Sequence, residues 1–165
     1  MADEHADLIK TAKKIHEKAR YLRGRFLNTL AVVERDIGLI LTEYFCTNDE
    51  NKQELFFEKV VERLSLQRKK EIIIEIMKHE FPFWWDENKK LLSNFDEIQQ
   101  FRNKLAHSIV DVSEEALLRP IDQGVGFVQW KQGQPVTDKE FEDMEVKANM
   151  IGSALAGIKQ LLRLN

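Results

Sequence analysis

The chain has 165 residues, of which 43% are hydrophobic and 32% are charged, and its formal net charge is −3. This length suits one domain, and we expect a single helical domain over residues 1–165. The composition excludes a disordered chain and a strongly basic nucleic-acid coat protein, so any contact with RNA must be local. Cys46 is the only cysteine, which excludes an internal disulfide and a zinc site built from several cysteines.

No run of apolar residues approaches the ~18 residues of a membrane span. The first residues also lack the apolar stretch of a signal peptide. A single cysteine fits a reducing compartment. We therefore expect a cytoplasmic protein without a membrane segment.

Apolar residues at helical spacing predict a charged helix over residues 3–22. Gly24 is expected to break this helix, and a more apolar helix is predicted from about residue 25 to residue 45. A loop at residues 47–49 should precede a third helix over residues 50–64. The second of these helices is the best candidate for the centre of the core.

Ser65 is expected to cap a fourth helix, and Pro82 is expected to end it. Asp86 is a suitable start for the next helix, which runs to about His107. One face of that helix is apolar at helical spacing and should be buried: Leu91, Leu92, Phe95, Ile98, Phe101 and Leu105.

The pattern then changes, and residues 109–112 and 125–131 are typical of strands. Thr137 with Glu140 three residues later forms a capping box, which predicts a last helix over residues 138–164. The predicted fold is all-α: a helical bundle of about five to six helices, with a small β-hairpin inserted before the C-terminal helix.

The segment Arg102-Asn103-Lys104-Leu105-Ala106-His107 closes the predicted amphipathic helix. Arginine offers a planar fork of donors, and histidine gains and loses a proton near neutral pH. Asn103 and His107 are four residues apart and share a helix face, whereas Arg102 and His107 are about 140° apart around the axis. An arginine, an amide and an imidazole together favour handling of a phosphodiester, and a dimer that joins two such motifs makes better chemical sense than one copy.

The stretch Phe101–Ser108 resembles the signature of HEPN domains, the higher eukaryotes and prokaryotes nucleotide-binding superfamily. That signature has an arginine, a polar residue that is often asparagine, a few further residues and a histidine near the end of a late helix. Residues 30–45 are similar to the family's second helix, where Glu34 matches an acidic position. Residues 127–133 and the helix after them resemble the mannitol-operon-repressor-like branch. The likeness covers about residues 20–165 in architecture, and only residues 102–107 are motif-specific.

HEPN domains are helical bundles that often dimerise with two motifs facing each other, and many are metal-independent endoribonucleases of toxin–antitoxin and antiviral systems. The resemblance therefore implies a homodimer, an RNA substrate, a possible antitoxin or other protein partner, and neither metal nor cofactor. His107 would act as general acid or base, and Arg102 would stabilise the charge of the phosphorane. Asn103 would orient His107 or a phosphate oxygen, and Glu34 would support Arg102 or His107.

Other interpretations remain open for the same residues. Arg102 and His107 can simply bind free carbonyls at the helix end, and Glu34 can form an ion pair with Arg35 or another basic residue. Some HEPN domains have lost catalysis, so a repressor-like regulatory or scaffold protein is the main alternative. A nucleotide-sensing domain would instead place a pocket near the aromatic segment at residues 81–85.

The remaining candidates have weaker signals. Lys10, Lys14 and Lys18 form a basic stripe that suits an RNA backbone, but a solvated helix face explains it better. Trp130 could contact a partner, although packing on the bundle is the simpler expectation. No ligand spacing for a metal accompanies the remaining histidines: His5, His16 and His79.

Overall fold

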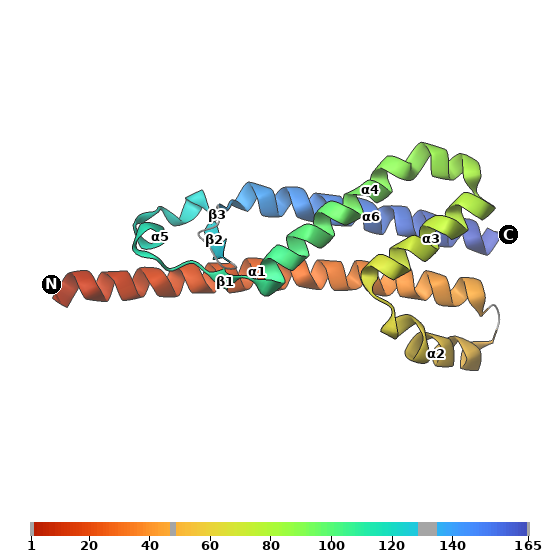
Figure 1. Ribbon diagram of the computed structural model, residues 1–165, viewed down its shortest axis with the longest axis horizontal. Coiled ribbons are helices and arrows are strands. Elements are labelled where there is room, and N and C mark those ends of the chain that lie inside the picture. Colours follow the sequence, from red (N-terminus) through yellow and green to blue (C-terminus); the bar gives the residue numbers. More distant parts are fainter. Residues whose placement is uncertain (1, 47–48, 129–134, 165) are drawn as a thin grey trace. The chain divides into compact units, whose positions relative to one another are not determined.

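The computed structural model describes residues 2–46, 49–128 and 135–164 (Figure 1). In these ranges six α-helices and a small antiparallel sheet confirm the predicted all-α class with a β insertion. The elements in chain order are α1 (Ala2–Phe45), α2 (Glu50–Lys59), the 3₁₀ helix η1 (Val61–Arg63), α3 (Leu66–Glu80), α4 (Pro82–His107), β1 (Ile109–Val110), α5 (Glu114–Leu118), the 3₁₀ helix η2 (Ile121–Gln123), β2 (Val125–Val128), β3 (Pro135–Val136) and α6 (Asp138–Leu164). None of the helices in this part of the chain is long and apolar enough to cross a membrane.

Helix α1 is continuous over 44 residues, so the predicted break at Gly24 is wrong. A glycine costs about 1 kcal/mol relative to alanine inside a helix, but it ends a helix only when the backbone turns to positive φ. Gly24 keeps helical geometry, and the apolar stripe passes through it without interruption, with Leu22 and Phe26 both buried. The burial on either side outweighs the weak local propensity.

The predicted third helix is shorter than expected, because α2 ends at Lys59 and the 3₁₀ turn η1 follows. Val61 of that turn is fully buried. Gly38 of α1 makes this approach possible, since a Cβ there would lie 3.0 Å from the Phe57 ring and 3.1 Å from Val61. A glycine inside α1 thus receives the α2–η1 segment.

The start of α3 is confirmed: the Ser65 hydroxyl accepts a hydrogen bond from the Arg68 amide. The start of α4 is not at Asp86, because the helix already begins at Pro82. Proline suits the first helical position, where its missing N–H leaves no bond unmade. The residue that was expected to end one helix therefore opens the next, and Phe81 alone lies between α3 and α4.

The β insertion has three short strands in the order β1-β2-β3, both pairs antiparallel, where a hairpin was expected. Ile109 pairs with Val128 and Val110 with Phe127. Residues 129–131 of the predicted second strand, including Trp130, lie outside the described residues. The capping box before α6 is confirmed, because the Glu140 amide donates to the Thr137 hydroxyl and the Glu140 carboxylate accepts from the Thr137 amide.

The chain forms two compact units, and α1, α4 and α6 contribute to both. Unit 1 comprises residues 1–28 and 97–146, and it contains the sheet and the C-terminal part of α4. Its core is aromatic: Phe101 makes edge contacts with Phe26 and Phe141, with ring centroids 4.9 and 5.2 Å apart.

Unit 2 comprises residues 29–96 and 147–165 and contains α2, η1 and α3. Its buried side chains are mainly aliphatic, and the largest of them are Ile37, Ile40, Leu41, Ile73, Met77, Phe95, Ile151 and Leu155. Two charged residues of α3, Lys69 and Lys70, are also buried in this unit. Each of them is held by a carboxylate of the same unit.

Candidate functional site

The last two turns of α4 lie in unit 1 and are strongly amphipathic. Phe101 and Leu105 are buried, whereas Arg102, Asn103 and His107 are exposed. This alternation follows from the helical period, because residues four apart share a face. All three predicted catalytic side chains therefore reach solvent.

The structure brings Arg102 and Asn103 together directly. The Arg102 guanidinium donates to the Asn103 side-chain oxygen at 3.1 Å. Asn103 is one helical turn from His107, where Cβ atoms are about 5–6 Å apart. Around the helix axis, Asn103 lies between Arg102 and His107, and the hydrogen bond shows that the Arg102 side chain is turned toward Asn103. We call the exposed surface of Arg102, Asn103 and His107 the motif strip.

Ala106 is the small exposed residue beside His107 on this surface. Neither His107 nor Arg102 has a carboxylate partner in residues 2–46, 49–128 and 135–164. The motif strip therefore presents cationic and neutral donors that the described chain does not neutralise.

The end of α4 is capped by other residues. The Ser108 carbonyl accepts a hydrogen bond from the Arg23 guanidinium at 2.8 Å, and the Ser108 hydroxyl donates to the Lys104 carbonyl. Within the described part of the chain, neither Arg102 nor His107 binds a backbone carbonyl. The interpretation of these two residues as helix caps thus finds no contact to support it.

Glu34, the predicted supporting acid, lies in unit 2 and forms an ion pair with Lys69, with Nζ and Oε1 2.9 Å apart. The lysine side chain is 7% exposed and the carboxylate side chain 39%. The ion pair that was one of the open interpretations is therefore present, although its partner is Lys69 and not Arg35. Whether Glu34 also supports catalysis stays a prediction.

The basic residues of α1 divide into two groups within unit 1. Lys18, Arg23 and Arg25 hold structural partners: Asp138 and the Ile121 carbonyl for Lys18, Ser108 for Arg23, and Glu145 for Arg25. Lys10 and Lys14 are exposed. The predicted stripe of three lysines is consequently not one uniform solvated face.

The structure describes some of the other candidates and leaves one of them out. Among the described residues no cluster of histidine, cysteine and carboxylate side chains is arranged to hold a metal ion. In the aromatic segment, Phe83 is fully open to solvent while Phe81, Trp84 and Trp85 are half-buried, and the Lys78 ammonium lies 5.5 Å from the Trp85 ring centre. Trp130 lies outside the described residues.

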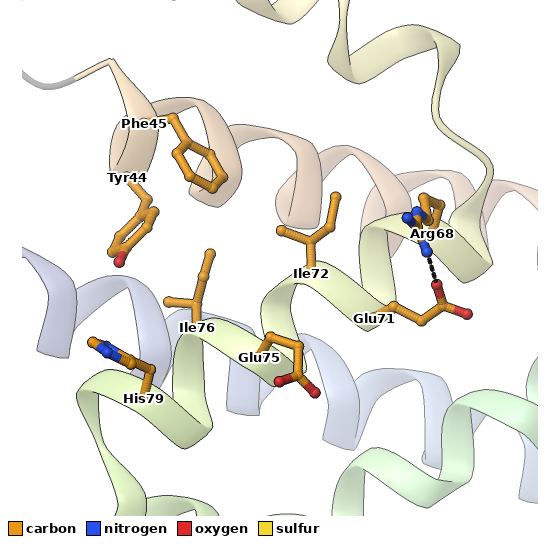
Figure 2. Close-up of a pocket in the computed structure, with 8 residues that line it drawn as sticks. All are labelled: Tyr44, Phe45, Arg68, Glu71, Ile72, Glu75, Ile76 and His79. Carbon is orange, nitrogen blue, oxygen red and sulfur yellow. Dashed lines mark hydrogen bonds and ion pairs between the residues drawn. The ribbon is translucent and has the colours of Figure 1, made fainter.

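Unit 2 contains a groove of about 460 Å³ between the end of α1 and one face of α3 (Figure 2). Its floor is Tyr44, Phe45, Ile72 and Ile76, and charged residues line its edge. The Tyr44 hydroxyl donates to Glu80 at 2.8 Å, which raises the pKa of Tyr44 and lowers the pKa of Glu80. None of the predicted catalytic residues lines this groove.

Comparison with protein-family models, with curated proteins and with solved structures gave no match. The HEPN resemblance therefore rests on the residues of this chain alone.

Arg23 is the residue near the motif that sequence reasoning missed. No role was predicted for this residue from the sequence. Its contact with Ser108 joins positions 85 apart in the chain. No local sequence pattern signals a contact at that separation.

Proposed function

We propose that the protein is a metal-independent endoribonuclease of HEPN type, acting as a homodimer in a bacterial defence or toxin–antitoxin setting. The observation that carries the proposal is the motif strip. Its arginine, amide and imidazole are exposed together, and they have no carboxylate partner in the described chain. An anionic substrate is bound by exposed cations and hydrogen-bond donors that no carboxylate of the protein already occupies.

The proposed reaction is an internal transfer at phosphorus. The ribose 2′-oxygen forms a bond to the adjacent phosphorus, the bond from phosphorus to the 5′-oxygen breaks, and the products are a 2′,3′-cyclic phosphate and a 5′-hydroxyl. The 2′-hydroxyl loses its proton to a base, and the leaving 5′-oxygen gains a proton from an acid. His107 can perform one of these transfers, a role worth about 10²–10⁴-fold in rate.

Arg102 would bind the phosphate oxygens whose negative charge grows in the transition state. Asn103, already in contact with Arg102, would orient the guanidinium or a phosphate oxygen. One imidazole supplies one of the two proton transfers at a time, so the second would come from the motif strip of a second copy. This requirement is the chemical reason for proposing a homodimer.

The test is cleavage of single-stranded RNA in the presence of EDTA by the wild-type chain, His107→Ala and Arg102→Ala. We expect at least a 100-fold loss of rate in each variant and a cyclic phosphate at the new 3′ end. His16→Ala, another exposed histidine, is the matched control and should cleave at the wild-type rate. Unchanged cleavage in His107→Ala would remove the catalytic assignment.

A non-catalytic regulatory or scaffold protein is the second candidate, and the apolar surface of unit 2 favours it. Phe45, Leu55 and Val60 are 55%, 60% and 42% exposed. Apolar side chains gathered at a surface are typical of protein contacts. A protein of this class would bind its partner equally well with His107→Ala, whereas Phe45→Ser and Leu55→Ser would weaken the binding.

A further inference from the structure

Arg23 of α1 holds the residue that follows the histidine of the motif strip. Its Nη2 donates to the Ser108 carbonyl oxygen at 2.8 Å. The last carbonyls of a helix have no partner inside the helix and must be satisfied from outside. Arg23 supplies that partner one residue beyond His107, from a helix that is remote in sequence.

The guanidinium of Arg23 is itself fixed in place. It lies over the Phe127 ring at 5.1 Å from the centre, and its buried Nε has no hydrogen-bond partner among the residues that the structure describes. Phe127 is fully buried and is the register partner of Val110. Arg23 therefore contacts the strand that pairs with β1, and β1 begins two residues after His107.

Two further bonds restrict the same short segment. The Ser108 hydroxyl donates to the Lys104 carbonyl, which closes the last turn of α4. The Asp111 amide donates to the Gly126 carbonyl at 2.9 Å, which continues the pairing of β1 with β2. Three hydrogen bonds therefore restrict the segment that follows His107, and of these three only the bond from Arg23 comes from a charged group.

We propose that Arg23 is a positioning residue that fixes the imidazole of His107 by anchoring the end of α4. Helix ends fray when their carbonyls lack partners, and a catalytic group must be held to within about 0.5 Å of its working position. The expected effect of Arg23 on the cleavage rate rests on the proposed function. The expected effect of Arg23 on the position of the His107 imidazole rests on the geometry alone.

Arg25 provides a matched control two residues further along α1. Its guanidinium donates twice to the Glu145 carboxylate of α6, at 2.6 Å each. Arg25 and Arg23 are therefore both arginines of α1 that bind another element of unit 1. They differ in their targets, because only the bond of Arg23 ends next to His107.

The kinetic experiment measures RNA cleavage by Arg23→Gln, Arg23→Lys and Arg25→Gln, each well below its own melting temperature. Arg23→Gln should lower kcat at least tenfold and leave KM within threefold, and Arg23→Lys should recover part of kcat because it keeps a donor for the Ser108 carbonyl. Arg25→Gln should keep kcat within threefold. Equal kcat values for the two glutamine variants would overturn the proposal. A loss confined to KM would also overturn it, because Arg23 would then bind substrate.

The second experiment needs no activity. The imidazole signal of His107, assigned with His107→Gln, is recorded by NMR in ¹³C-histidine-labelled protein. Arg23→Gln should shift and broaden this signal, whereas Arg25→Gln should leave it as in the wild type. Identical spectra in all three proteins would overturn the proposal. If the wild-type chain shows no His107-dependent cleavage, the proposed function fails and this measurement alone decides the role of Arg23.

Discussion

The start of α3 in unit 2 and the end of α4 in unit 1 differ in how their basic side chains are paired. In unit 2 the basic residues at the start of α3 are all paired: Arg68 with Glu71, Lys69 with Glu34 and Lys70 with Asp96. At the end of α4 in unit 1, neither Arg102 nor His107 is paired with a carboxylate of the described residues. Pairing removes the cost of placing a charge near the core, so the charges of α3 have a structural explanation. The charges of the motif strip are exposed and unpaired in the described chain, and the proposed function rests on that availability.

The largest effect on the free energy of unfolding is expected at Phe101, the buried residue that directly precedes the motif strip. Phe101→Ala removes the ring that contacts both Phe26 and Phe141, and the free energy of unfolding should fall by about 3–5 kcal/mol. Chemical denaturation at 25 °C measures this loss. Phe83→Ala, at an exposed position, should change the same quantity by less than about 0.5 kcal/mol. A loss below about 1 kcal/mol in Phe101→Ala would contradict the core described for unit 1.

The ion pair of Lys69 and Glu34 gives the next largest effect. Glu34→Ala leaves a buried ammonium without its carboxylate and should cost about 2–3 kcal/mol, less than for a fully buried pair because Glu34 is 39% exposed. Lys69→Met should cost less than about 1 kcal/mol, because the remaining carboxylate can be hydrated. Denaturation curves measure both.

The same variant tests the catalytic role that the HEPN resemblance implies for Glu34. If the ion pair is its whole role, Glu34→Ala cleaves RNA at the wild-type kcat below its melting temperature. A loss of kcat in Glu34→Ala together with a normal kcat in Lys69→Met would assign Glu34 to the site and weaken the contrast between the units.

A smaller and pH-dependent effect is expected at Glu43 of unit 2. Burial alone would raise the pKa of this carboxyl, but hydrogen bonds from Lys159 and Arg163, at 2.8 and 3.1 Å, outweigh burial and lower the pKa. A group with a depressed pKa contributes its full stability above its unfolded pKa and loses it as the pH falls through the folded value. Glu43→Gln should cost about 0.5–1 kcal/mol at pH 7. The difference from wild type should shrink as the pH falls below the pKa of an unfolded glutamate, about 4.3, and should vanish once the pH is below the lowered folded pKa, as thermal melts across that range would show. A difference that persists in acid would contradict the ion pair.

The smallest effect on stability is expected in the motif strip itself. Arg102 is exposed, and in the described part of the chain its bond is to the neighbouring Asn103, so Arg102→Ala should change the free energy of unfolding by less than about 0.5 kcal/mol. Lys14→Ala, at another exposed position of unit 1, is the control. A loss above about 1 kcal/mol would show that Arg102 has a structural task, and the contrast with α3 would no longer hold.

Much of the fold followed from local patterns. Ser65 and Thr137 marked helix starts because their hydroxyls bind amides three residues away, a contact that the sequence contains in full. The break at Gly24 failed because propensity is a weak local term, and the buried residues on both sides decide the outcome. Pro82 was ambiguous because the same residue ends one helix and begins another.

The candidate site was predictable in part for the same reason. The periodic pattern around Phe101 and Leu105 fixes which residues of α4 face outward, so the exposure of Asn103 and His107 was a consequence of the sequence. The contact between Arg23 and Ser108 was not, because it depends on tertiary packing within unit 1. The burial of Lys69 beside Glu34 was not predictable either, because the spacing of apolar residues along α3 does not indicate a buried lysine.

Among the glycines inside the long helices, Gly24, Gly152 and Gly157 differ from Gly38, because a Cβ added at any of these three would meet no described atom within 4 Å apart from the backbone of its own helix. Each glycine forgoes about 1 kcal/mol that alanine would supply, without any steric requirement for it. Replacing these glycines of α1 and α6 by alanine should therefore raise the melting temperature. Amide protons next to these positions should exchange with solvent faster than those elsewhere in the same helices, because transient opening is easiest where the helix is intrinsically weakest.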